Sequence, residues 1–86
     1  MNIYVGNLDF KVNEHDLETL FGQYGEVSSV TIVVDKYSGR SRGFGFVDME
    51  DNNEAKKAIN ELNGKSLKSR DIVVNEARPR RDKFGK

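Results

Sequence analysis

The sequence contains no cysteine and no tryptophan, has a single proline, and has no hydrophobic run long enough to span a membrane. Without cysteine, disulfide bonds and thiolate metal sites are excluded, so the fold has to be stabilised by packing. A spanning helix needs about 18 or more consecutive apolar residues, and the N-terminus lacks the basic and apolar regions of a signal peptide. We therefore expect a soluble, cytoplasmic protein without a membrane partner, with one small domain in its 86 residues.

An excess of either charge is also missing, because 14 lysine and arginine residues stand against 14 aspartate and glutamate residues. The distribution is uneven, however. Residues 36–42 contain three cations and no acid, and residues 78–86 contain five cations and one acid. The acids gather on the two predicted helices instead. Short charge runs are often only solvated surface, so their meaning depends on the residues that share their face of the molecule.

Hydrophobic periodicity predicts four strands and two helices. Alternating or β-branched apolar residues indicate strands, and apolar residues at i, i+3, i+4 and i+7 indicate helices. The first helix should begin at Glu14, because Asn13 can cap it with Asp16 at the third helical position, and Gly25 should end it. In chain order we expect a strand at 3–6, a helix from 14, strands at 27–34 and 42–49, a helix from about 52 that closes at 63–64, and a strand at 72–77.

This strand–helix–strand–strand–helix–strand order is the split βαβ arrangement of the α+β ferredoxin-like fold. The expected architecture is a four-stranded antiparallel sheet with both helices on one face, which leaves the other face open to water. We assign residues 1–79 to this domain and residues 80–86 to a basic, flexible C-terminal tail. The fold alone does not define a function, because many unrelated proteins share it.

Aromatic side chains are expected on the open face of the sheet. Period two in residues 42–49 puts Phe44 and Phe46 on one side and core residues on the other. The same alternation in residues 3–6 leaves Tyr4 pointing outward, on a strand that lies beside 42–49 in this topology. A one-residue slip would expose as much apolar surface, so an apolar patch is unavoidable and indicates a ligand. Flat rings beside basic segments suit nucleobases, which stack on aromatic rings at about 1–3 kcal/mol per base.

Two segments resemble the signature motifs of the RNA-recognition-motif family. Residues 42–49, RGFGFVDM, match the octamer pattern of that family, and residues 3–8, IYVGNL, resemble its hexamer. Met49 replaces the aromatic residue usual at the eighth octamer position, but this position faces the core. The resemblance covers residues 2 to about 79. It is closest to small single-domain RNA-binding proteins of bacteria and to the recognition domains of glycine-rich RNA-binding proteins.

The resemblance implies roles for individual residues. Tyr4 and Phe44 would each stack a base. Phe46 would lie against a base or between sugars, and Arg42 would pair with a phosphate. The partner would be single-stranded RNA, with single-stranded DNA as an open alternative, and the monomeric protein would act as a post-transcriptional regulator or RNA chaperone. Secondary contacts are expected from Asn7, Lys11, Val33, Arg40, Val73, Asn75, Ala77, Arg78 and Arg80.

We expect no cofactor, no metal site and no catalytic residues. His15 has no second ligand at metal spacing and should be a surface residue. Gly43 and Gly45 lie inside a strand rather than between a strand and a helix, so they should let bases approach the sheet rather than cradle a phosphate. Two other functions stay open: a protein-interaction module that uses the acidic helix face, and a small ferredoxin-like enzyme such as an acylphosphatase.

Overall fold

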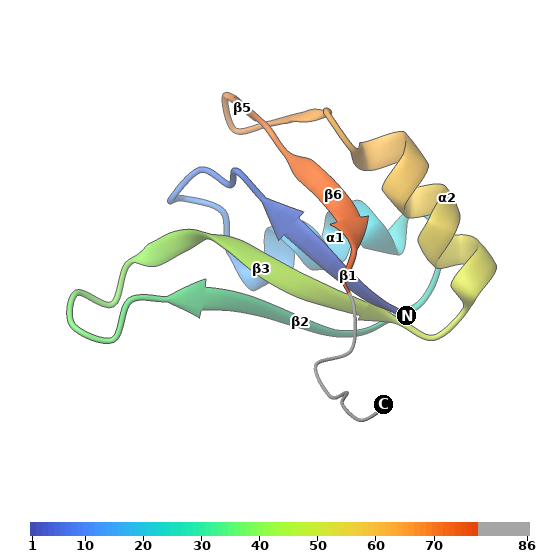
Figure 1. Ribbon diagram of the computed structural model, residues 1–86, viewed down its shortest axis with the longest axis horizontal. Helices are drawn as coiled ribbons and strands as arrows, with labels where there is room; N and C mark the ends of the chain where they lie inside the picture. The colour runs from blue at the N-terminus through green and yellow to red at the C-terminus, as the bar shows by residue number, and fades with distance from the viewer. Residues whose placement is uncertain (78–86) are drawn as a thin grey trace, which may run out of the picture.

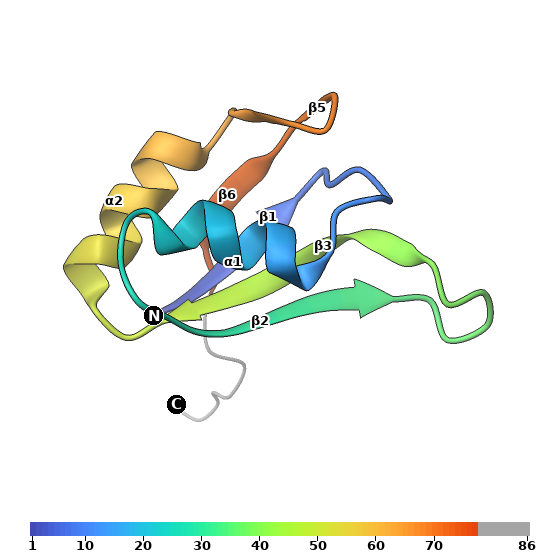
Figure 2. The same cartoon turned by 180° about the vertical axis from the view of Figure 1, so that it is seen from behind.

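Four antiparallel strands form one sheet in the order β2-β3-β1-β6 (Figure 1). The computed structural model describes residues 1–77 of the chain. Helices α1 (Glu14–Gly22) and α2 (Asn52–Leu62) lie behind the sheet in Figure 1 and in front of it in Figure 2. The predicted α+β ferredoxin-like architecture is confirmed. The strands of the sheet are β1 (Asn2–Gly6), β2 (Val27–Val34), β3 (Ser41–Met49) and β6 (Val73–Glu76).

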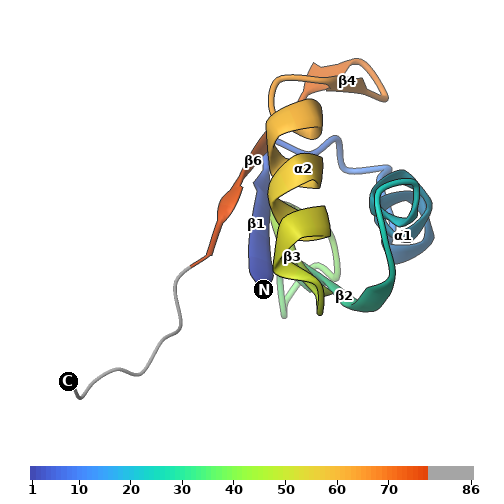
Figure 3. The ribbon, with the colours of Figure 1, turned by 90° about the vertical axis from the view of Figure 1, so that its right-hand side faces the viewer.

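The hydrophobic core lies between the sheet and the helices, which form two separate layers when the molecule is seen from the side (Figure 3). Among the side chains that the structure describes, none that is polar or charged is buried, so the described core is entirely apolar. Within residues 1–77, no helix is long and apolar enough to cross a membrane. The core consists of Ile3, Val5, Leu8, Val12, Leu17, Phe21, Ile32, Val47, Met49, Ala55, Ala58, Leu62, Ile72 and Val74.

Helix α1 begins where the sequence predicts, because a capping box fixes its first turn. The Asn13 side chain accepts a hydrogen bond from the backbone N–H of Asp16 at 2.9 Å, and the Asp16 carboxylate accepts one from the Asn13 N–H at 3.1 Å. Each residue thereby satisfies a donor that the helix itself leaves unpaired.

The predicted end of α1 at Gly25 is wrong. The helix stops at Gly22, and the N–H of Tyr24 donates to the carbonyl of Phe21 at 3.0 Å in a tighter final turn. Gly25 instead provides space for the side chain of Glu54. A β-carbon added to it would lie 2.7 Å from Cβ of Glu54, a residue of α2. The glycine thus permits the close approach of the chain to α2, a contact between distant residues that local sequence does not reveal.

Helix α2 runs as predicted. The Asp51 carboxylate accepts hydrogen bonds from the N–H groups of Asn53 and Glu54 at its start. At its end the Asn63 side chain accepts a hydrogen bond from the N–H of Val74 at 3.0 Å, and Gly64 adopts φ +86°. This arrangement ties the end of α2 to strand β6, which occupies one edge of the sheet.

A short hairpin, β4 (Ser66–Leu67) and β5 (Arg70–Asp71), lies between the second helix and the last strand of the sheet, where the sequence predicts no strand. Its two central residues, Lys68 and Ser69, have φ values of +48° and +77°. Tight two-residue hairpins with both values positive usually contain asparagine or glycine. Neither is present here, so the sequence carries no local signal for this hairpin.

Candidate nucleic-acid interface

The open face of the sheet, the side without helices, carries three aromatic rings on the two central strands. Tyr4 of β1 lies opposite Phe46 of β3 in the antiparallel ladder, and Phe44 is on the same strand as Phe46. The ring centroids are 6.0, 6.0 and 6.3 Å apart, within the roughly 4.5–7 Å typical of aromatic pairs. All three residues are half-buried, in contrast to the fully buried Val47 and Met49. The predicted orientation of the strands is confirmed.

Two of these rings belong to a row of side chains that crosses the whole sheet. Thr31 on β2 lies opposite Phe46, Phe46 opposite Tyr4, and Tyr4 opposite Asn75 on β6. Thr31 and Asn75 are both exposed. A flat ligand laid along this row would therefore meet two rings in the middle and a hydrogen-bonding side chain at each edge.

The ring of Tyr4 occupies space that Gly6 leaves free. Residues 4 and 6 are on the same face of β1. A β-carbon on Gly6 would meet the Tyr4 hydroxyl oxygen and would lie 2.8 Å from Cε2 and Cζ of the ring. Gly6 therefore allows the Tyr4 ring to lie along the strand. This role was not predicted from the sequence, although the glycine two residues after an outward tyrosine is a signal that could have indicated it.

Arg42 begins the ring-bearing part of β3 at an exposed position and is close to the turn at Asp35. The Asp35 carboxylate accepts hydrogen bonds from the N–H groups of Tyr37 at 2.8 Å and Ser38 at 3.1 Å. The pKa of Asp35 is below its ordinary value. The hydrogen bond from Tyr37 contributes most to this shift, followed by the bond from Ser38 and the charge of Arg42. The loop before Arg42 is thus ordered by an ionised carboxylate.

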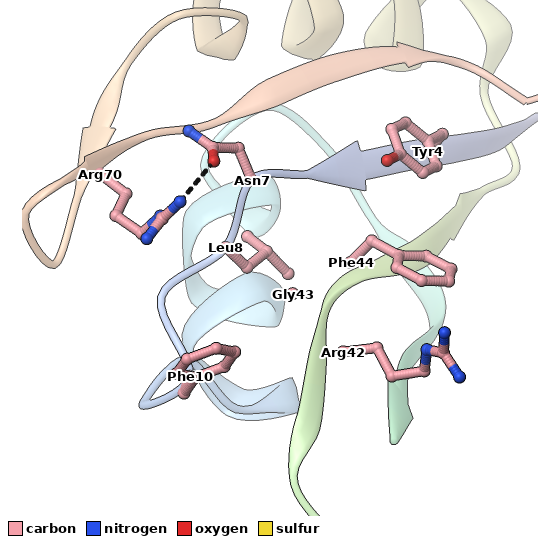
Figure 4. A pocket seen from close by; sticks show the side chains of 8 residues that line it. All are labelled: Tyr4, Asn7, Leu8, Phe10, Arg42, Gly43, Phe44 and Arg70. Atoms are coloured by element: carbon pink, nitrogen blue, oxygen red, sulfur yellow. Dashed lines mark hydrogen bonds between the residues drawn. The ribbon is translucent and has the colours of Figure 1, made fainter. Parts of the chain in front are cut away.

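A pocket of about 300 Å³ opens next to Phe44, at the end of β1 (Figure 4). It combines four predicted site residues, Tyr4, Asn7, Arg42 and Phe44, with four residues that were not predicted to belong to the site. Of these, Phe10 in the loop after β1 is 69% exposed, and Arg70 comes from the β4–β5 hairpin. The pocket is lined by Tyr4, Asn7, Leu8, Phe10, Arg42, Gly43, Phe44 and Arg70.

Comparison with known proteins agrees with this geometry. The sequence model of the RNA recognition motif matches residues 3–73. The chain belongs to the RNA recognition motif family. Both segments that carry the family signature, residues 3–8 and 42–49, fall within the match and supply the three rings of the open face.

Several RNA recognition motif proteins are similar over nearly the whole chain. A protein of Nostoc sp. named "Putative RNA-binding protein RbpB" is 47% identical over 85 residues, which are 99% of this chain and 82% of that protein. The crystal structure of the RNA-binding protein PG1 is 51% identical with a TM-score of 0.90, covering 95% of this chain and 99% of that one. An Sxl-lethal protein–RNA complex is 31% identical with a TM-score of 0.86, and the match covers 91% of this chain and 47% of that one.

The other predicted residues lie around the edges of this RNA recognition motif domain. Val33 on β2 and Ala77 after β6 are half-buried, whereas Val73 and Asn75 on β6 are exposed, which agrees with their predicted outward direction. Lys11 and Arg40 are exposed in loops. None of these six lines the pocket beside Phe44. Arg78, Arg80, the boundary at residue 79 and the tail at 80–86 lie outside the described residues.

The glycines of β3 have different roles from the one we expected. Gly45 is buried on the core side, and a β-carbon there would meet the backbone oxygen of Thr31 and lie 3.1 Å from Cα of Ile32. It therefore permits close pairing with β2 rather than the approach of a base. Gly43 adopts φ +86° where the register between β2 and β3 shifts, a conformation that glycine adopts without strain.

Proposed function

We propose that the chain binds single-stranded RNA on the open face of its sheet. The observation that carries this proposal is the group of three half-buried rings on the two central strands. Rings in this position do not fill the core, and bases can stack on them. Tyr4 and Phe44 would each stack a base, and Phe46 would contact a base or the sugars. The peripheral residues at the sheet edges and loops would contact base edges and phosphates.

Further parts of the proposal rest on similarity. The solved protein–RNA complex among the structural relatives supports RNA as the ligand, and the name of the Nostoc protein agrees with it. We infer a monomer that acts in the cytoplasm on RNA after transcription, as a regulator or chaperone, without catalysing a reaction. Single-stranded DNA would bind too if no contact reads the 2′-hydroxyl group.

Removing single rings tests the proposal. Phe44→Ala and Phe46→Ala should each weaken binding to a single-stranded RNA by about 1–3 kcal/mol, because one stacked base loses its ring. Cooperative thermal unfolding should persist, since neither ring is part of the core. Fluorescence titration and thermal melts would measure the two effects separately.

Tyr24→Ala is the matched control, because Tyr24 is also half-buried but packs against the core. It should lower the melting temperature and leave RNA affinity unchanged. A duplex of the same sequence should bind the wild-type protein much more weakly than the single strand, because stacking requires unpaired bases. Equal affinity for both forms, or loss of folding in Phe46→Ala, would contradict the proposal.

A further inference from the structure

The pocket beside Phe44 continues the ring-bearing surface past the end of β1. Tyr4 and Phe44 form its side toward the sheet, and Phe10 and Arg70 stand on the opposite side (Figure 4). Phe10 is 69% exposed, so its ring contributes little to the core. The volume of the pocket, about 300 Å³, is at the lower end of the range for ligand pockets, which is about 300–1,000 Å³. A pocket of this size suits one small planar group.

Arg70 is held in place by a neutral side chain. One of its terminal nitrogens donates to Oδ1 of Asn7 at 2.8 Å, and Nδ2 of Asn7 donates to the carbonyl oxygen of Asp71 at 2.7 Å. Asn7 itself adopts φ +56° at the end of β1. Within residues 1–77 no carboxylate forms an ion pair with Arg70. The guanidinium thus keeps its full charge and most of its five N–H donors, but in a fixed orientation.

Leu8 and Gly43 form the bottom of the pocket, and neither has a side chain that protrudes into it. Leu8 is 2% exposed, with its side chain in the core. Its N–H donates to the carbonyl of Gly43 at 2.8 Å, which joins the loop after β1 to the start of β3. Gly43 has no side chain, and its φ of +86° disfavours any other residue. The space between Phe10, Arg70 and Phe44 is therefore built into the backbone.

We propose that this pocket is an additional nucleotide site, in which a guanine base stacks on Phe10 and offers its O6 and N7 atoms to the guanidinium of Arg70. Two parallel N–H donors of arginine fit these two acceptors, and such a pair distinguishes guanine from other bases. Asn7 acts as a positioning residue, because it orients Arg70. This inference rests on the proposed binding of single-stranded RNA and adds a base preference to it.

A guanine scan tests the site. Hexauridylate is compared with hexamers that carry one guanosine at each position in turn, by fluorescence titration at low salt. At least one position should increase the affinity of the wild-type protein about tenfold. Arg70→Met keeps most of the length of the side chain but removes all of its donors, so the gain should shrink to less than about twofold. Phe10→Ala should weaken binding of that hexamer by about 5- to 100-fold.

Two further variants test the positioning of Arg70 by Asn7 and the effect of removing a positive charge elsewhere in the protein. Asn7→Gly suits the left-handed backbone but removes the amide that holds Arg70, so the affinity gain of the guanosine-containing hexamer over hexauridylate should fall. Lys57→Ala removes an exposed cation of α2, on the helix side of the sheet, and should leave the gain intact. Thermal melts check that each variant is folded.

Three outcomes would overturn the inference. The first is that no guanine position binds more tightly than hexauridylate. The second is that the gain survives Arg70→Met. The third is that Arg70→Ala weakens all hexamers equally, which would indicate a phosphate contact. Phe46→Ala, measured in the same titrations, distinguishes this failure from failure of the proposed function. If Phe46→Ala weakens binding of hexauridylate while the guanine effects are absent, RNA binding stands and the additional site does not.

Discussion

At the scale of single residues, Gly6 determines where the ring of Tyr4 lies. An added β-carbon would occupy the position of that ring, and the ring would move because it is the flexible partner. We expect Gly6→Ala to weaken RNA binding by about 1–2 kcal/mol, comparable with the loss of one stacked base, while the protein still folds. Binding titrations alongside chemical denaturation would measure this.

Gly22→Ala is a matched control for that prediction. Outside the adjoining residues and helix backbone, no atom lies within 4 Å of a β-carbon added at Gly22, in the last turn of α1. Alanine favours helix over glycine by about 0.5–1 kcal/mol, so this variant should be slightly more stable and bind RNA normally. Unchanged RNA affinity in Gly6→Ala would mean that the position of the Tyr4 ring does not matter for binding.

The ordered turn before Arg42 should respond to acid. The N–H of Tyr37, then that of Ser38, and then the charge of Arg42 lower the pKa of Asp35. A lowered folded-state pKa means that the carboxylate stabilises the turn above the unfolded-state pKa, and that this contribution is lost as pH falls through the folded-state pKa. The amide NMR signals of Tyr37 and Ser38 should therefore shift together, with a midpoint below the ordinary value of 3.8. A midpoint at or above 3.8 would contradict this assignment.

At the same scale, the sequence predicted residues whose position depends on strand alternation and missed those placed by loops. Period two alone directs Tyr4, Phe44 and Phe46 to the open face. Phe10 stands in a loop without periodicity. Arg70 reaches the pocket only because the β4–β5 hairpin folds toward the end of β1, an arrangement set by backbone angles that the residue types do not indicate.

At the scale of elements, the β4–β5 hairpin contains backbone strain that one substitution can relieve. Ser69 has φ +77°, a conformation that costs a residue other than glycine about 1–2 kcal/mol. Ser69→Gly should stabilise the protein by about 0.5–1 kcal/mol, since glycine's greater freedom when unfolded offsets part of the gain. Chemical denaturation would measure the change. The substitution preserves the ion pair between Lys68 and Asp16, 3.8 Å apart.

A serine-to-glycine substitution in a strand should instead destabilise the protein. Ser29→Gly replaces an exposed residue of β2, where glycine destabilises by about 0.5–1 kcal/mol. If Ser69→Gly destabilised the protein as much as Ser29→Gly, the left-handed backbone at Ser69 would impose no strain.

Both helix starts and the end of α2 were predictable, whereas the end of α1 and the β4–β5 hairpin were not. Asn13 and Asp51 cap their helices through contacts with residues two or three positions later, and such local contacts are visible in a sequence. The close approach of Gly25 to Glu54, by contrast, joins residues that meet only in the folded molecule. The two-residue hairpin strands were missed because Lys68 and Ser69 lack the usual turn residues.

At the scale of the whole molecule, the balanced charge divides into two unequal parts. Residues 1–77 contain nine cations and thirteen acids, whereas residues 78–86 contain five cations and one acid. Most of the acids are in or next to α1 and α2, on the side of the sheet away from the rings. The segment that follows β6 therefore holds five of the fourteen cations of the chain within nine residues.

Truncation after Pro79 should flatten the salt dependence of RNA binding. If two or three of the removed cations contact phosphates, the slope of log affinity against log salt should fall by about 1–2 units, at about 0.7 per single-strand contact. Base preference should stay the same, because phosphate contacts carry little sequence information. Titrations at several salt concentrations would measure the slope.

A double substitution of Lys56 and Lys57 by alanine removes exposed cations from α2 and controls for net charge alone. It should leave the slope nearly unchanged. An unchanged slope after truncation would mean that the segment contacts no phosphate, and an altered base preference would mean that it reads bases.

The three rings stand on β1 and β3, and each of these strands is paired on both sides within the sheet. Backbone amides in such strands generally exchange with solvent only when much of the protein opens. The proposed binding surface is thus already ordered before RNA arrives, and the loss of conformational entropy on binding comes from the RNA and the loops. Encounter requires no slow rearrangement of the sheet. Ligands of different affinity should accordingly differ mainly in how long they remain bound.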